Sequence, residues 1–304
     1  MKSEMKKQDI FGLSAALITP FRADGLVDLP RLLRHANYVL DQGCDTITLF
    51  GTTGEGFSIG MRERAAMIGA VLAGGVEANK LNAGVTATTV ADAVEQSRLA
   101  LDFGARGLLL APPFYFKGPD EDGLFSWFSD VIQGIGGDAR GVILYHIPGQ
   151  TAVPLSVALV DRLKQAFPGV ITGVKDSSGD SATAEAFLAA HGELAILVGD
   201  ERQLAGAMRK GAQGSICGLA NIAPRLLRDV IHEARDNPLI VPLVDLIVSY
   251  PVMPAVKALV AHIHDDDEYL RMRAPLVDLP EKDRTALVSA YEAILAPGQD
   301  RKTA

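Results

Sequence analysis

Residues 170–180 read VITGVKDSSGD, a short apolar run rich in β-branched side chains that is closed by a polar, glycine-containing segment. This pattern is typical of a buried strand that enters a loop, here at Lys175. Seven further runs predict strands, at 15–19, 46–50, 82–85, 107–111, 142–146, 195–199 and 214–217. The runs recur at intervals of about 30 residues, which is the length of a βαβ unit.

Segments with helical periodicity separate these strands. In residues 29–40, apolar side chains recur three and four positions apart, as on one face of a helix. Further helices are predicted at 63–72, 90–101, 123–132, 155–166, 182–190, 204–209 and 224–234. Strict alternation of eight strands and eight helices predicts a closed (β/α)8 TIM barrel over residues 1–236. Helical patterns at 239–248, 255–264 and 284–295 predict a C-terminal helical extension, residues 237–304, that packs on the barrel.

Composition limits the classes of partner. The chain has 304 residues, of which 48% are hydrophobic and 22% charged, as in ordinary globular proteins. The net charge of −8 argues against nucleic acid or an anionic membrane surface as the main partner, but it does not exclude a small anionic substrate. We see no transmembrane segment in the sequence.

The location is predicted from two features. Cys44 and Cys217 lie in apolar stretches without a neighbouring cysteine, as expected of free thiols in a reducing compartment. The basic start, Met1–Lys7, is followed by a short apolar stretch that we interpret as the first strand rather than as an export signal. We therefore expect a cytoplasmic protein.

In TIM barrels the functional site lies at the C-terminal ends of the strands, where Lys175 is predicted to lie. Burial disfavours the charged form of an amine. A neutral amine is what Schiff-base formation with a keto acid requires. The alternative is a structural lysine that reaches the rim of the barrel and pairs with Asp176.

Two other strand ends carry candidate groups. After the second strand, Gly51, Thr52, Thr53 and Gly54 combine backbone N–H groups that an anion can approach with hydroxyl donors, which predicts a carboxylate site. The alternative is a tight turn in which a threonine caps the next helix. Tyr145 ends the fifth strand, next to that of Lys175, where it can transfer a proton.

Tyr145 also has an alternative reading, as a core residue with a locally satisfied hydroxyl. His146 alternates to the other face of the strand and is interpreted as structural. The aromatic loop APPFYFKGP, residues 111–119, is expected to cover a pocket or a neighbouring subunit. The sequence has no HExxH motif or Cys–His cluster that would hold a catalytic metal, and no GxGxxG motif follows the first strand.

Several of these segments resemble one family of enzymes. ALITPF at 16–21, GTTGE at 51–55, YHIP at 145–148, GVKD at 173–176 and GSI at 214–216, together with Pro254 and Lys257, are similar to the pyruvate-dependent class I aldolases and synthases. This family includes dihydrodipicolinate synthase and N-acetylneuraminate lyase, and the chain is most similar to dihydrodipicolinate synthase-like proteins. The resemblance covers almost the whole chain.

The resemblance implies a role for each candidate residue. Lys175 would form the Schiff base with pyruvate or another 2-oxo acid, and Tyr145 would transfer protons. Thr53 would bind the carboxylate, and Thr52 would link Tyr145 to Tyr115 of an adjacent subunit in a homotetramer built as a dimer of dimers. The remaining substrate-binding residues would be Gly51, Gly54, Gln150, Gly199 and Ile216. An aldehyde would be the second substrate, and neither a metal nor an organic cofactor is expected.

The chain departs from this family at the second substrate. Gln150 stands where dihydrodipicolinate synthases have an arginine that binds the carboxylate of aspartate semialdehyde. Glutamine lacks the charged bidentate contact, a loss of about 1.5–3 kcal/mol. Two activities therefore remain open: a 4-hydroxy-tetrahydrodipicolinate synthase of lysine biosynthesis, and an aldolase or dehydratase for a 2-keto-3-deoxy sugar acid or related 2-oxo acid. A non-catalytic sensor that binds pyruvate is a third alternative.

Overall fold

The computed structural model describes residues 10–296, in which parallel strands form a closed barrel in the order β1 to β8. Hydrogen bonds between β1 and β8 close the barrel, with Gly12 opposite Gly214. The predicted TIM barrel is confirmed. The strands are β1 Gly12–Ala16, β2 Thr46–Leu49, β3 Leu81–Val85, β4 Gly107–Leu110, β5 Val142–His146, β6 Ile171–Asp176, β7 Ala195–Val198 and β8 Gly214–Cys217.

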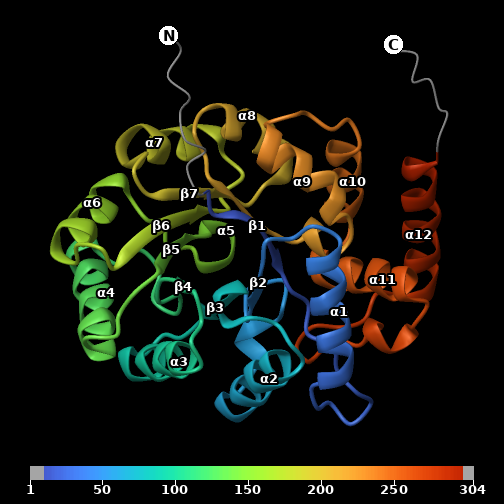
Figure 1. Ribbon diagram of the computed structural model, residues 1–304, viewed down its shortest axis with the longest axis horizontal. Coiled ribbons are helices and arrows are strands. Elements are labelled where there is room, and N and C mark those ends of the chain that lie inside the picture. The colour runs from blue at the N-terminus through green and yellow to red at the C-terminus, as the bar shows by residue number, and fades with distance from the viewer. Residues whose placement is uncertain (1–9, 297–304) are drawn as a thin grey trace.

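Helices surround the barrel as an outer ring (Figure 1). They are α1 Leu29–Asp41, α2 Met61–Ala73, α3 Val90–Asp102, α4 Glu121–Ile135, α6 Val157–Ala166, α7 Ser181–His191, α8 Leu204–Arg209 and α9 Pro224–Glu233, and the short helix α5 Pro148–Thr151 lies inside this ring. Successive side chains of a strand point to opposite faces, so alternate residues pack in two separate cores, one between the barrel and the helices and one inside the barrel. Leu144 and Val174 pack outward against the helices, whereas Tyr145 and Leu197 belong to a smaller cluster inside the barrel.

The first strand lies three residues earlier than predicted. The apolar run 15–19 suggested a strand over its whole length, but β1 spans Gly12–Ala16. Leu17, Ile18 and Thr19 are buried without belonging to the strand. The backbone N–H of Ile18 donates instead to Oδ1 of Asn221, at 3.1 Å. A buried loop with its hydrogen bonds satisfied by a distant side chain therefore has the same apolar pattern as a strand.

The segment after the barrel contains α10 Ile240–Val248, α11 Val252–His264 and α12 Glu281–Leu295. Figure 1 shows them grouped on one side of the barrel, and α11 buries eight of its residues from Pro254 to Ala261. Among residues 10–296, no single helix is both long and apolar enough to cross a membrane; α10 and α11 together meet those two criteria but are bent by 120° at the break between them.

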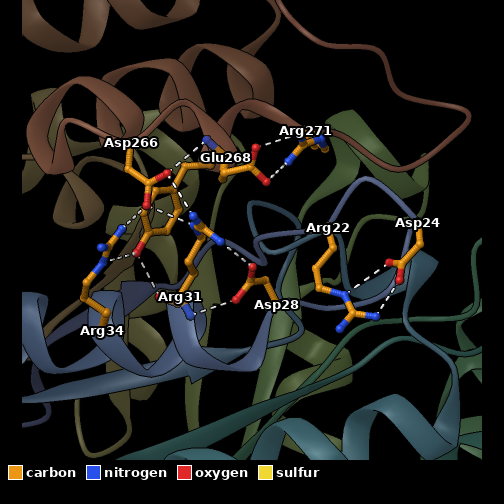
Figure 2. Close-up of polar contacts among 9 residues, drawn as sticks. Arg22, Asp24, Asp28, Arg31, Arg34, Asp266, Glu268 and Arg271 are labelled. Atoms are coloured by element: carbon orange, nitrogen blue, oxygen red, sulfur yellow. Dashed lines mark hydrogen bonds and ion pairs between the residues drawn. The ribbon is translucent and has the colours of Figure 1, made fainter.

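Charged side chains attach this segment to the first barrel helix (Figure 2). Asp266, just after α11, accepts hydrogen bonds from Arg31 at 2.9 Å and from Arg34, both on α1. Arg31 also donates to Asp28, the N-cap of α1, at 2.7 Å. The two Arg31 contacts are partly buried, so solvent screens them less than an exposed pair. They fix the end of α11 relative to the barrel.

Candidate active site

A cavity of about 290 Å³ opens at the C-terminal ends of the strands. Of the residues predicted for the site, seven line it: Thr52, Thr53, Tyr145, Gln150, Lys175, Gly199 and Ile216. They come from the ends of β5, β6, β7 and β8, from the loop after β2 and from the short helix α5, and they meet because the barrel closes. The strand order alone brings these side chains to one mouth.

Lys175 and Tyr145 are direct neighbours on β6 and β5. The Lys175 Nζ donates a hydrogen bond to the Tyr145 hydroxyl at 3.1 Å and lies 4.3 Å from the centre of its ring. Both side chains are buried. The Lys175 amine makes no ion pair with a carboxylate of residues 10–296, and Asp176 instead accepts from the Ser178 backbone N–H at 2.9 Å. The structure therefore does not show the alternative in which Lys175 pairs with Asp176.

The pKa of Tyr145 reflects two opposing effects. Burial raises the pKa of this phenol, but the adjacent Lys175 charge and hydrogen bonds with Thr52, Lys175 and Ser177 outweigh burial, so the pKa lies below its ordinary value. The Thr52 Oγ1 lies 3.4 Å from the phenol oxygen. A phenol with a lowered pKa and two hydroxyl neighbours is suited to pass a proton to and from a group bound at Lys175.

The loop after β2 presents donors to the same cavity. The backbone N–H groups of Thr52, Thr53 and Gly54 have no acceptor among the described residues, whereas Gly56 N–H donates to the Gly51 carbonyl at 3.1 Å. Gly54 packs so closely that a Cβ there would lie 2.4 Å from the Leu17 carbonyl oxygen. Gly51 and Gly54 lie outside the lining, and they shape the loop through their backbone. Three free N–H groups and two hydroxyls make a cradle for an anion.

A buried ion pair holds this loop. Glu55 adopts a left-handed backbone conformation, with φ of 54°, and its carboxylate pairs with Lys257 of α11. The same carboxylate accepts the Arg273 N–H at 3.0 Å, and Lys257 also donates to the Arg271 carbonyl at 2.6 Å. Burial lowers the pKa of Lys257 to about 8. The C-terminal helices therefore take part in placing the anion cradle.

Two predicted features lie away from the cavity of this chain. Tyr115 is 73% exposed on the loop after β4, with its ring against that of Phe116. Its role in another subunit's site stays a prediction. His146 faces outward from β5, where its Nδ1 accepts the Leu155 N–H at 2.9 Å and its ring meets Phe187 of α7. Its structural role agrees with the alternation of the strand.

Sequence reasoning missed several residues that line the cavity. They are Ser177, Ser178, Glu201 and Arg202 from the strand ends, with Val244, Ile247, Val248, Val252, Met253 and Val256 from α10 and α11. The Glu201 carboxyl is buried, which raises its pKa, and its Oε1 accepts the Leu219 N–H at 2.9 Å. Nothing in the sequence distinguishes the apolar stripes of α10 and α11 from an ordinary helix core, because both have the same period.

Comparisons with known proteins agree with this geometry. The model of the dihydrodipicolinate synthetase family matches residues 9–294. A DapA-like lyase of Chloroflexus aurantiacus, described as uncharacterised, is 34% identical over 293 residues, which are 94% of this chain and 97% of the relative. Both matches extend over the barrel and the C-terminal helices.

Two crystal structures are similar over the same length. Dihydrodipicolinate synthase from Agrobacterium tumefaciens is 49% identical with a TM-score of 0.92, over 94% of this chain and 100% of that chain. The chloride-inhibited dihydrodipicolinate synthase from Acinetobacter baumannii, complexed with pyruvate, is 31% identical with a TM-score of 0.83, over 94% of this chain and 99% of that chain.

Proposed function

The chain belongs to the dihydrodipicolinate synthetase family, whose members are class I lyases, and from that premise we propose that it forms and breaks carbon–carbon bonds through a Schiff base between Lys175 and pyruvate. The observation that supports this most directly is the 3.1 Å contact between the Lys175 amine and the Tyr145 hydroxyl inside a cavity. Beside it lie the free N–H groups of the loop after β2. Schiff-base chemistry on a 2-oxo acid requires an amine to attack the ketone, a group that transfers protons and a binding site for the carboxylate.

Binding precedes the chemistry in this proposal. The pyruvate carboxylate accepts hydrogen bonds from the N–H groups of the Thr52–Gly54 loop and from the Thr53 hydroxyl. That contact directs the ketone carbon toward Lys175. After the Lys175 amine gives up its proton it adds to this carbon, and loss of water leaves a protonated imine that withdraws electrons from the neighbouring methyl group. Tyr145, with Thr52 beside it, moves the protons that these steps release and consume.

The imine then reacts at its methyl carbon. Loss of one methyl proton gives an enamine, whose carbon attacks the carbonyl carbon of an aldehyde. The aldehyde oxygen takes up a proton from Tyr145, and water hydrolyses the imine to release the product and the free amine. Cleavage follows the same steps in reverse. Neither direction of the reaction consumes an oxidant or a reductant.

A homotetramer is part of the proposal, because Tyr115 and Phe116 are 73% and 77% exposed on the loop after β4. A second copy that covers this loop would bring Tyr115 toward the Thr52 of its neighbour. Light scattering on the purified protein tests the assembly. A monomer with full activity would contradict the assigned role of Tyr115. We also propose a cytoplasmic location, which is supported by the two buried free thiols, Cys44 and Cys217.

Two second substrates compete within this chemistry. The similarity to dihydrodipicolinate synthase from Agrobacterium tumefaciens favours aspartate semialdehyde, which would make the chain a 4-hydroxy-tetrahydrodipicolinate synthase. Gln150 in the cavity wall favours a different 2-oxo acid, such as a 2-keto-3-deoxy sugar acid, because an amide is a weaker partner for a carboxylate than arginine. Expression in a lysine auxotroph that lacks the synthase distinguishes them. Growth without lysine supports the synthase, and no growth despite soluble protein contradicts it.

Borohydride reduction in the presence of pyruvate tests the covalent step. We expect a pyruvyl adduct on Lys175 by peptide mass mapping, none without reductant, and none in the variant Lys175→Arg. A folded protein that gives no adduct would contradict the proposal. Turnover separates an enzyme from a sensor, because a sensor would bind pyruvate and release no condensation or cleavage product. If Lys175 is only structural, Lys175→Ala will alter stability and leave activity intact.

A further inference from the structure

The charges of the cavity limit what its second substrate can carry. Among the described residues that line it, the cationic side chains are Lys175 and Arg202. Lys175 is the proposed attachment point for pyruvate, so it cannot also hold an anionic group at the far end of the other substrate. Arg202 is therefore the remaining candidate for that contact.

Arg202 is already engaged on all three of its nitrogens. Its Nε and one terminal nitrogen donate to the two oxygens of Asp200, at 2.9 and 2.8 Å. The other terminal nitrogen donates to Asp245 at 2.9 Å. One guanidinium between two carboxylates leaves a net negative charge, and the bidentate geometry with Asp200 is the strong one for arginine. An anionic substrate group would be repelled here rather than bound.

The wall opposite the strand ends is apolar. Val244 and Ile247 of α10 and Val256 of α11 are almost completely buried where they line the cavity. Val248 and Val252 continue this surface to the rim, where they are 49% and 38% exposed. Because α10 and α11 meet at a bend of 120°, the two helices form a concave corner. This corner is continuous with the cavity that holds Lys175.

The polar groups lie on the other side, at the strand ends. Tyr145, Thr52 and the N–H groups of the β2 loop surround the position proposed for pyruvate. In the proposed reaction they meet the reacting carbonyl groups, and Gln150, Ser177 and Ser178 also line this side of the cavity. The α10–α11 corner has no hydrogen-bond donor or acceptor on the side chains that line it, apart from the weak acceptor sulfur of Met253.

We propose that the aldehyde which condenses with pyruvate at Lys175, or is released from it, is uncharged and carries an aliphatic side chain that packs in the α10–α11 corner. This inference rests on the Schiff-base step of the proposed function, and at the same site it favours a related 2-oxo acid over both aspartate semialdehyde and a sugar acid as the second-substrate class. A carboxylate placed against these valines would lose its hydration without a partner. A polyol would lose hydrogen bonds for the same reason, whereas an aliphatic group gains by burial.

The reaction balances without a further component. The enamine carbon of pyruvate forms one bond to the aldehyde carbon, and the aldehyde oxygen becomes a hydroxyl by taking up a proton. Water then breaks the imine. The product is a 4-hydroxy-2-oxo acid with the aliphatic group on its fourth carbon.

Three aldehydes test the inference with pyruvate in excess. Succinic semialdehyde carries a carboxylate, 4-methylpentanal replaces that carboxylate with an isopropyl group of similar shape, and glyceraldehyde carries hydroxyls. The product is quantified by mass spectrometry. We expect kcat/KM for 4-methylpentanal to exceed both others by at least tenfold. Equal values, or a preference for the carboxylate or the hydroxyls, would overturn the inference.

Variants at the rim provide the matched test. Val252→Lys places a cation in the corner, and we expect it to shift the preference at least tenfold toward succinic semialdehyde. Val241→Lys makes the same change on α10 at a position that is 46% exposed and outside the lining, and it should leave the preference unchanged. If Val252→Lys does not fold, Val248→Lys replaces it. Equal shifts at 241 and in the corner would contradict the inference.

Borohydride trapping separates this test from that of the proposed function. A pyruvyl adduct on Lys175 together with no reaction of 4-methylpentanal overturns the assignment of the substrate class alone. Absence of the adduct overturns the proposed function, and the inference that rests on it fails as well.

Discussion

Lys257 and Glu55, 202 residues apart in the chain, form an ion pair in which neither side chain has any solvent exposure. Glu55 follows directly on the loop that contributes Thr52 and Thr53 to the cavity, and Lys257 lies on α11. The desolvation of two buried charges is costly, and removal of one partner leaves the other unpaired. The pair therefore couples the C-terminal helices to the position of the loop that is proposed to bind the pyruvate carboxylate.

The variant Lys257→Met should lose about 3–5 kcal/mol of unfolding free energy, because it leaves the Glu55 carboxylate buried without its cation. The loop should also be less well placed, so KM for pyruvate should rise about tenfold while kcat changes less. Urea unfolding and steady-state kinetics measure the two effects. Adding Glu55→Gln should recover part of the stability. A single variant as stable as the native chain would show that the pair does not hold the loop.

Lys210→Met serves as the control for this variant. Lys210 pairs with Glu185, and the two side chains are 57% and 53% exposed. An exposed pair contributes less than about 1 kcal/mol, so this variant should change neither the stability nor KM measurably.

Tyr145→Phe removes the hydroxyl that contacts both Lys175 and Thr52. We expect kcat to fall about 10²–10⁴-fold, the usual contribution of a positioned proton-transfer group. Borohydride should still trap pyruvate on Lys175, but more slowly. Tyr38→Phe, on α1 and away from the cavity, should retain full kcat. Unchanged turnover in Tyr145→Phe would exclude the phenol from proton transfer.

Gly199→Ala tests how closely the strand ends pack. A Cβ at this position would lie 2.2 Å from the Ser177 Oγ and 3.0 Å from the Asp176 carbonyl oxygen. Ser177, which is a hydrogen-bond neighbour of Tyr145, must then shift, and overpacking should cost about 1–3 kcal/mol of stability. We expect kcat/KM to fall at least tenfold. The double variant with Ser177→Ala should regain stability, because the hydroxyl that clashes is gone. Thermal unfolding and kinetics together check both parts.

The acid stability of the protein should depend on His35. This residue is completely buried, where burial, then the nearby charges of His264 and Arg34, lower its pKa to about 3. The Asn221 Nδ2 donates to the Ala16 and Gly218 carbonyls, so its Oδ1 accepts from the His35 Nε2–H at 3.1 Å. The folded protein therefore favours the neutral form of the His35 side chain.

The sign of this pH effect follows from the two pKa values. Between pH 6.5 and 3 the unfolded chain binds a proton at His35 that the folded chain does not, so stability falls as the pH falls. Between pH 7 and 5 the loss amounts to about 2 kcal/mol. Between pH 7 and 5, the variant His35→Gln should lose about 2 kcal/mol less unfolding free energy than the native chain, as measured by urea unfolding at the two pH values. Equal losses in both proteins would show that His35 is not the group responsible.

Much of the fold could be predicted, because a strand and a helix differ in the period of their apolar residues. β5, β8 and α8 have the predicted bounds. β1 was misplaced because burial of Leu17 and Ile18 continues beyond the strand. The short helix α5 was missed, since four residues are too few to show a period.

The site was predictable where it depends on strand order. Tyr145 and Lys175 end consecutive strands, and parallel neighbours in a barrel place such residues side by side. The Arg202 contact with Asp245 and the Glu55 contact with Lys257 join segments that no local pattern relates. The α10–α11 wall was unpredictable for the same reason, because an apolar face does not reveal whether it meets a core or a cavity.

The bend between α10 and α11 has an evolutionary consequence. α11 carries Lys257, so its sequence is tied to the loop that precedes Glu55. α10 contributes Val244, Ile247 and Val248 to the corner and no group to the proposed bond-making steps. After a gene duplication, residues 240–248 can therefore drift, or be exchanged between relatives, while the inherited Schiff-base machinery keeps working. New aldehyde preferences would then arise by changes in a nine-residue helix rather than in the barrel.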